Sequence, residues 1–90
     1  MKLQPEVVNV LEREKRVCDT AILQLQEKLK PYEREYGFNT KKFLEKFNSG
    51  DLGDDQAYFR WYANAKALED WKKTKEGLSD LLSGLERVNA

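Results

Sequence analysis

YGFNTKKFLEKFNSGDLGDD, residues 36–55, separates two long stretches of helical hydrophobic spacing and therefore decides how this chain folds. Gly37 is suited to the left-handed position just past a helix end. Asn39 is a good N-terminal cap for a helix that follows it, and Gly50 is a good end for that helix. The stretch therefore predicts a short helix over about 40–49, between two longer ones.

The second half of this stretch predicts a tight corner. Gly50 and Gly53 give the backbone freedom to turn, and Leu52 is the one apolar residue that can fold inward. Asp54 is expected to cap the third helix, and Asp55 is expected in its first turn, near the positive end of the helix dipole. The acidic residues thus have structural uses.

Two apolar columns, each with alternating steps of three and four residues, flank the corner. The first consists of Leu11, Cys18, Ile22, Leu25, Leu29, Tyr32 and Tyr36, with Lys15 in its one gap. The second consists of Trp61, Asn64, Leu68, Trp71, Lys75, Leu78, Leu82 and Leu85. We predict one all-α domain over 1–90, with long antiparallel helices at about 5–36 and 55–87. Because a lone helix pair leaves its columns half exposed, we also expect a homodimer that forms a four-helix bundle.

Three residues leave local questions open. Pro31 interrupts the first column, so the helix is either kinked or broken there. Gly77 and Gly84 lie seven residues apart on one face of the third helix, and each lowers helix stability by about 1 kcal/mol relative to alanine. They indicate close approach of another helix, a segment that orders only on binding, or fraying.

The aromatic residues just after the corner are candidates for partner binding. Tyr58, Phe59, Trp61 and Tyr62 cover most of one helical circumference, so one intramolecular face cannot bury them all. We expect Phe59 and Trp61 mainly in the core, whereas Tyr58 and Tyr62 can sit at an interface rim. Trp61 is nevertheless also a candidate for contact with a partner, together with Tyr58 and Tyr62.

A lysine within the second column is a further candidate. Lys75 either reaches solvent along its stem, or sets helix register, or marks the position of a partner's carboxylate.

Composition excludes several classes of function. Lysine plus arginine and aspartate plus glutamate number 16 each, so no strongly basic surface for nucleic acid is expected. The chain has no histidine, and its one cysteine, Cys18, lies in an apolar column where a small buried side chain is expected. We therefore predict no enzyme, no catalytic residues and no cofactor. A lone cysteine, with no signal peptide and no apolar run long enough for a membrane span, predicts a cytoplasmic protein.

The acidic corner does not have the spacing of a calcium loop. Counted from Asp51, the sixth position is Gln56, where an EF-hand loop needs glycine. The twelfth position is Tyr62, where such a loop needs glutamate. We therefore predict no metal site.

Residues 36–69 resemble a group of small helical proteins of archaea and cyanobacteria, several of which are described as antitoxin-like components of toxin–antitoxin pairs. The positions that carry the resemblance are Tyr36, Gly37, Phe43, Gly50, Leu52, Gly53, Asp54, Asp55, Phe59 and Trp61. It implies a protein-binding module that neutralises a small toxin by covering its surface. The alternative is a structural or adaptor coiled-coil protein without a toxin partner.

Overall fold

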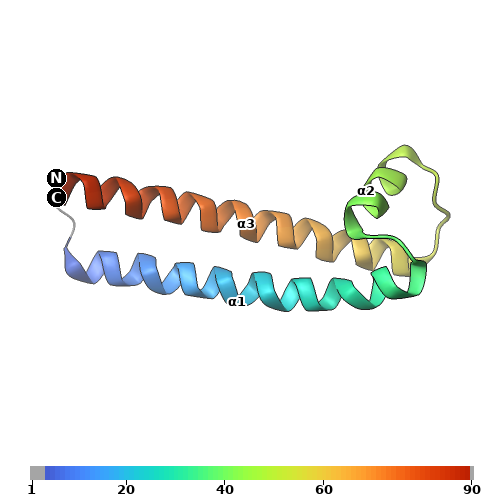
Figure 1. Cartoon of the computed structure of the whole chain (residues 1–90), viewed down its shortest axis with the longest axis horizontal. Helices are drawn as coiled ribbons and strands as arrows, with labels where there is room; N and C mark the ends of the chain where they lie inside the picture. The colour runs from blue at the N-terminus through green and yellow to red at the C-terminus, as the bar shows by residue number, and fades with distance from the viewer. Residues whose placement is uncertain (1–3, 90) are drawn as a thin grey trace.

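Two long helices lie side by side and antiparallel in the computed structural model, and a short helix folds across the end where they join (Figure 1). The structure describes the backbone of residues 4–89 and the side chains of residues 4–84. Helix α1 spans Pro5–Tyr36, α2 spans Thr40–Ser49 and α3 spans Gln56–Asn89. The predicted all-α hairpin is confirmed, and each helix begins and ends within two residues of its predicted position.

The two ends of α2 are formed by the residues that the sequence indicates. Gly37, just past α1, and Gly50, just past α2, both adopt φ 77°, a left-handed conformation that favours glycine. The Asn39 side chain accepts a hydrogen bond of 2.8 Å from the backbone N–H of Lys42, which caps α2 as predicted. The bend between α1 and α2 is therefore fixed by local chemistry.

The start of α3 differs from the prediction by one residue. Asp55, not Asp54, is the cap: its Oδ1 accepts a hydrogen bond of 2.9 Å from the N–H of Ala57. The Asp55 carbonyl oxygen also accepts the first turn's bond from the N–H of Tyr58, at 3.0 Å. Gly53 has no positive φ, and a Cβ there would meet nothing within 4 Å, so this corner does not require glycine at 53.

Both long helices are continuous at the residues where the sequence allowed a kink, a break or fraying. Helix α1 is unbroken at Pro31, which lies at an exposed position where water can take the place of the missing backbone bond. Helix α3 continues through Gly77 and Gly84, both exposed. A Cβ at either glycine would meet nothing within 4 Å, so neither marks a close approach within the chain.

The buried core occupies the bend half of the hairpin. The two predicted columns face each other, and the buried residues among the described side chains are Cys18, Ile22, Leu25, Leu29, Phe43, Trp61 and Ala65. Cys18 is only 1% exposed and serves as a small apolar residue, as predicted. Toward the open end the column residues of α1 and α3 are only half buried, and Leu85 lies outside the described side chains.

Trp61 is the centre of an aromatic cluster at the bend. Its ring stacks on Phe43, with 4.0 Å between centroids, and both side chains are 0% exposed. Three further rings stack around Trp61 at 5.5–5.6 Å, those of Tyr32, Tyr36 and Phe38. Leu52 folds back from the corner against this cluster, as predicted. Because stacked aromatic pairs add about 0.5–1.5 kcal/mol beyond their buried area, this cluster anchors the hairpin.

The molecule is a rod of 53 × 22 × 17 Å. Its radius of gyration is 17.6 Å, whereas a compact domain of this length has about 12 Å. Within the described part of the chain, no helix combines the length and the apolar character that crossing a membrane requires.

Candidate functional site

A short relay of hydrogen bonds ties the three helices together beside the aromatic cluster. The indole N–H of Trp61 donates to Thr40 Oγ1 at 3.0 Å, and that hydroxyl donates to Glu33 Oε2 at 3.0 Å. The backbone N–H of Thr40 also donates to Glu33 Oε2, at 2.7 Å. The buried indole is thus satisfied, and the carboxylate of α1 takes up two donors at the start of α2.

Next to this relay lies a groove between α1, α2 and α3, which we call the bend-end groove. Its volume is about 560 Å³, and it is open to solvent along one side. The apolar part of its lining consists of Leu29, Leu44, Ala65 and Leu68. The polar and charged part consists of Gln26, Glu27, Lys30, Glu33, Thr40, Lys41, Glu69 and Lys72. An apolar floor with a charged rim is the usual composition of a binding groove.

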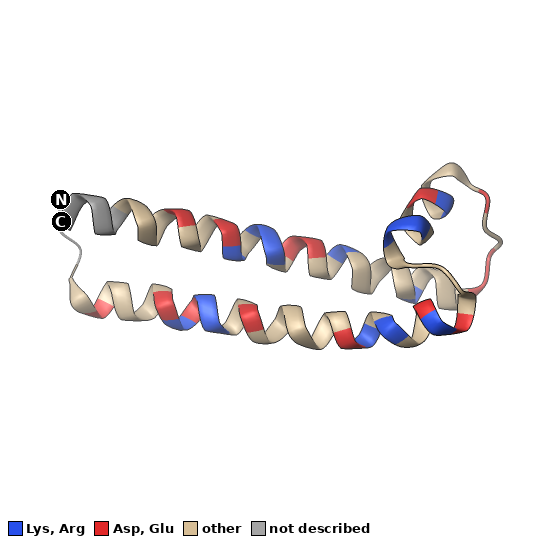
Figure 2. Ribbon diagram, in the orientation of Figure 1, with Lys and Arg blue, Asp and Glu red and all other residues tan. Residues whose placement is uncertain are grey.

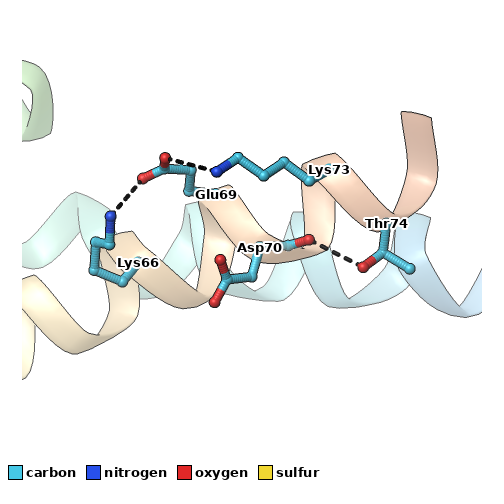
Figure 3. Close-up of polar contacts among 5 residues, drawn as sticks. All are labelled: Lys66, Glu69, Asp70, Lys73 and Thr74. Atoms are coloured by element: carbon cyan, nitrogen blue, oxygen red, sulfur yellow. Dashed lines mark hydrogen bonds and ion pairs between the residues drawn. The ribbon is translucent and has the colours of Figure 1, made fainter. Parts of the chain in front are cut away.

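The carboxylates of this rim are already engaged within the chain. Figure 3 shows Glu69 between two lysines of α3: Lys66 lies 3.1 Å and Lys73 lies 3.4 Å from its oxygens. Their hydrogen bonds and charges, chiefly those of Lys66, lower the pKa of Glu69, and the bond to Glu69 raises the pKa of Lys66.

The other two carboxylates of the rim have partners as well. Glu27 pairs with Lys30 at 2.8 Å, and Glu33 belongs to the relay. Among the described residues, Lys41 and Lys72 take part in no ion pair, so the charge that the rim offers a ligand is positive.

The candidate contact residues predicted from the sequence lie elsewhere. Tyr58 and Tyr62 are half buried and pack on α2, where Tyr62 stacks on Phe47 at 4.4 Å and Tyr58 lies 6.2 Å from Phe43. Trp61 is fully buried and has no surface to offer a partner. These three residues hold the bend together in the structure.

Lys75 has a partner within its own chain. Its Nζ lies 2.6 Å from Asp19 Oδ1, so the pair joins α3 to α1. Both side chains remain more than 40% exposed, so the pair contributes little stability. Lys75, which was a candidate for pairing with a partner's carboxylate, therefore pairs with a carboxylate of its own chain.

Phe59 corrects the predicted division of the aromatic residues. The prediction places Phe59 in the core, whereas its side chain is 53% exposed and meets the ring of Phe47 edge-on at 5.8 Å. The buried face of α3 is formed by Trp61 and Ala65, and Phe59 lies outside the core cluster, at the edge of the contact with α2. Sequence spacing could not reveal this because it does not say where α2 packs.

The corner carries a titratable contact. Burial, and then the nearby carboxylate of Asp55, raise the pKa of the Tyr36 phenol. The ionisation of Tyr36, at the end of α1, therefore depends on the charge of Asp55, just before α3. No three potential metal ligands among histidine, cysteine, aspartate and glutamate gather at one point in the described part of the chain.

Positively and negatively charged residues are interspersed along α1 and α3, as the blue and red positions in Figure 2 show. Comparisons of the chain with protein-family models, with curated proteins and with solved structures found no match. The resemblance of residues 36–69 to antitoxin-like proteins therefore stays a prediction.

Proposed function

We propose that this protein works by binding another protein, and that the bend-end groove receives one segment of that partner. The observation that carries the proposal is the combination of an apolar floor, built from Leu29, Leu44 and Leu68, with Lys41 and Lys72 on the rim. Three different helices contribute to the lining, so the groove is set by the fold and is largely preformed.

The lining indicates the chemistry of the segment. A groove of about 560 Å³ that is open along one side suits a few successive side chains of an amphipathic helix or extended chain. The aliphatic floor takes their apolar side chains, and the two lysines favour carboxylates beside them. A segment that alternates apolar and acidic residues fits both requirements.

The resemblance narrows the partner to a small toxin. Residues 36–69 supply half of the groove lining, namely Thr40, Lys41, Leu44, Ala65, Leu68 and Glu69. The segment that carries the antitoxin-like resemblance therefore also builds one wall of the groove. In this proposal the groove holds a segment of the toxin and keeps its active surface covered.

Co-expression tests this proposal. A neighbouring gene in the same genome is expected to encode a small protein that is toxic alone and harmless when co-expressed with this chain. Lys41→Glu reverses one rim charge, and it leaves α2 intact because an acidic residue is favourable in a first turn. We expect it to abolish rescue and co-purification. The matched control is Lys28→Glu, at an exposed position of α1 outside the groove, which is expected to rescue fully.

Two results would count against different parts of the proposal. If the neighbouring gene product is harmless when expressed alone, the toxin part of the proposal is wrong, and the adaptor function remains. Full rescue by a Lys41→Glu variant that is as helical as the wild type, by circular dichroism, removes the groove as the binding site.

A further inference from the structure

A third apolar column runs along one flank of the hairpin, beside the two columns that pack within the chain. In α1, Val10 and Val17 directly precede the column residues Leu11 and Cys18, and they are 48% and 45% exposed. In α3, the corresponding positions before Leu68, Lys75 and Leu82 are Ala67, Thr74 and Leu81. Leu81 is 49% exposed. A helix that packs against one partner needs only two apolar positions per heptad, so a third indicates a second contact.

The two halves of this column lie on the same side of the molecule. In antiparallel helices that face each other, the positions just before the facing residues fall on the same flank. The structure agrees, because Val17 and Ala21 of α1 line one shallow groove together with Trp71 of α3. We call the surface formed by Val10, Val17, Ala21, Trp71, Leu78 and Leu81 the flank face. It shares no residue with the bend-end groove.

The exposed area is larger than a compact monomer of this size has. The chain exposes 6571 Å², whereas a compact monomer of 10.6 kDa is expected to expose about 5,500 Å². The excess of about 1,100 Å² is more than the roughly 800 Å² that each partner loses in a standard interface. One further apolar contact of that size would lower the exposed area per chain to about the value expected for a compact protein of this mass.

Charge favours a second copy of the same chain as the occupant. The chain carries 16 positive and 16 negative residues, so two copies do not repel each other through net charge. The groove within the flank face is lined by two neutral polar side chains, Thr20 and Gln24, and by two cations, Arg13 and Arg16. Both arginines are exposed, so their charged ends can stay in solvent when two such faces meet.

We propose that the flank face binds the flank face of a second copy, which gives a homodimeric four-helix bundle. The contact is isologous, so each apolar residue is buried twice and the two-fold symmetry closes the assembly at two chains. Trp71, half buried in the single chain, lies in the groove of this face beside Val17 and Ala21 and becomes its main anchor.

Sedimentation equilibrium of the purified full chain at micromolar concentration tests the proposal. The wild type is expected at twice 10.6 kDa. Val17→Lys is expected to raise the dissociation constant by about tenfold or more, because symmetry places two lysines in the apolar contact. The matched control is Leu23→Lys, which removes a more exposed apolar residue of the same helix, 63% exposed and away from the flank face. It is expected to remain dimeric.

Each outcome decides the proposal. A folded Val17→Lys chain that is monomeric, while Leu23→Lys is a folded dimer, supports it. A wild type that stays monomeric up to about 100 µM, well above the roughly micromolar affinity of a weak specific contact, overturns it. So does a Val17→Lys dimer as tight as that of Leu23→Lys.

Discussion

At Thr40 a single hydroxyl joins three helices. It belongs to the first residue of α2, accepts from the indole of Trp61 in α3, and donates to Glu33 in α1. The sequence does not reveal this role, because Thr40 follows the predicted helix cap Asn39 and nothing in the sequence marks it as special. Its partners lie 7 and 21 residues away along the chain, and only the finished fold brings them together.

Thr40→Val tests the relay at nearly constant side-chain volume. The substitution leaves the buried Trp61 N–H without an acceptor, and we expect the free energy of unfolding to fall by about 1–3 kcal/mol. Urea denaturation followed by circular dichroism measures the change. The control is Thr74→Val, whose exposed hydroxyl donates to the Asp70 carbonyl of its own helix, as Figure 3 shows. A loss for Thr40→Val no larger than the control's would show that the relay does not stabilise the bend.

At the level of the helices, two adjacent aspartates show where sequence reasoning reaches its limit. Asp54 and Asp55 are equally good caps by residue type, so residue type gave no basis for predicting Asp54, and that prediction was wrong. The structure selects Asp55, whose carboxylate also lies near the Tyr36 phenol at the end of α1. The start of α3 is thus set partly by packing against another helix.

Alanine substitutions at these two positions give a matched comparison. We expect Asp55→Ala to lower the free energy of unfolding by about 1 kcal/mol through loss of the cap. Asp54→Ala, with no hydrogen bond among those of the described residues, is expected to change it by less than about 0.5 kcal/mol. Thermal denaturation of both variants under identical conditions measures the difference. Equal losses, or a larger loss for Asp54→Ala, would contradict the observed start of the helix.

Across the whole molecule, stability is concentrated at one end. Among the side chains that the structure describes, every buried one lies between Cys18 and Ala65, and the aromatic cluster closes the bend. At the other end α1 and α3 are held by half-buried column residues such as Leu11 and Leu82. The two halves of the same helices therefore differ in how much apolar surface they bury.

Hydrogen exchange at the backbone amides should report this difference. We expect amides of α1 near Leu29 and of α3 near Ala65 to exchange through nearly complete unfolding. Amides near Leu11 and Ser79 should exchange faster, by local opening of the open end. Each helix is its own control, since the comparison runs along one continuous element. Uniform protection along both helices would contradict the polarised core.

The sequence predicted the hairpin because helix spacing and caps are local signals. Columns with steps of three and four residues, with Gly37, Asn39 and Gly50 between them, define the elements without reference to distant contacts. The bend-end groove and the exposure of Phe59 could not be predicted, since both depend on how α2 packs on α3.

The position of the aromatic cluster has a consequence for the order of folding. Tyr36 and Tyr58 meet across a loop of about 20 residues, whereas Asp19 and Lys75 meet across more than twice that length. Closing a loop costs about 0.6 kcal/mol more for each doubling of its length, so the contact nearest the bend forms at the lowest entropic cost. It also gains the largest apolar contact, and we therefore expect the transition state to contain the bend. The far ends of the helices then come together last, and they are the first part to separate when the protein unfolds.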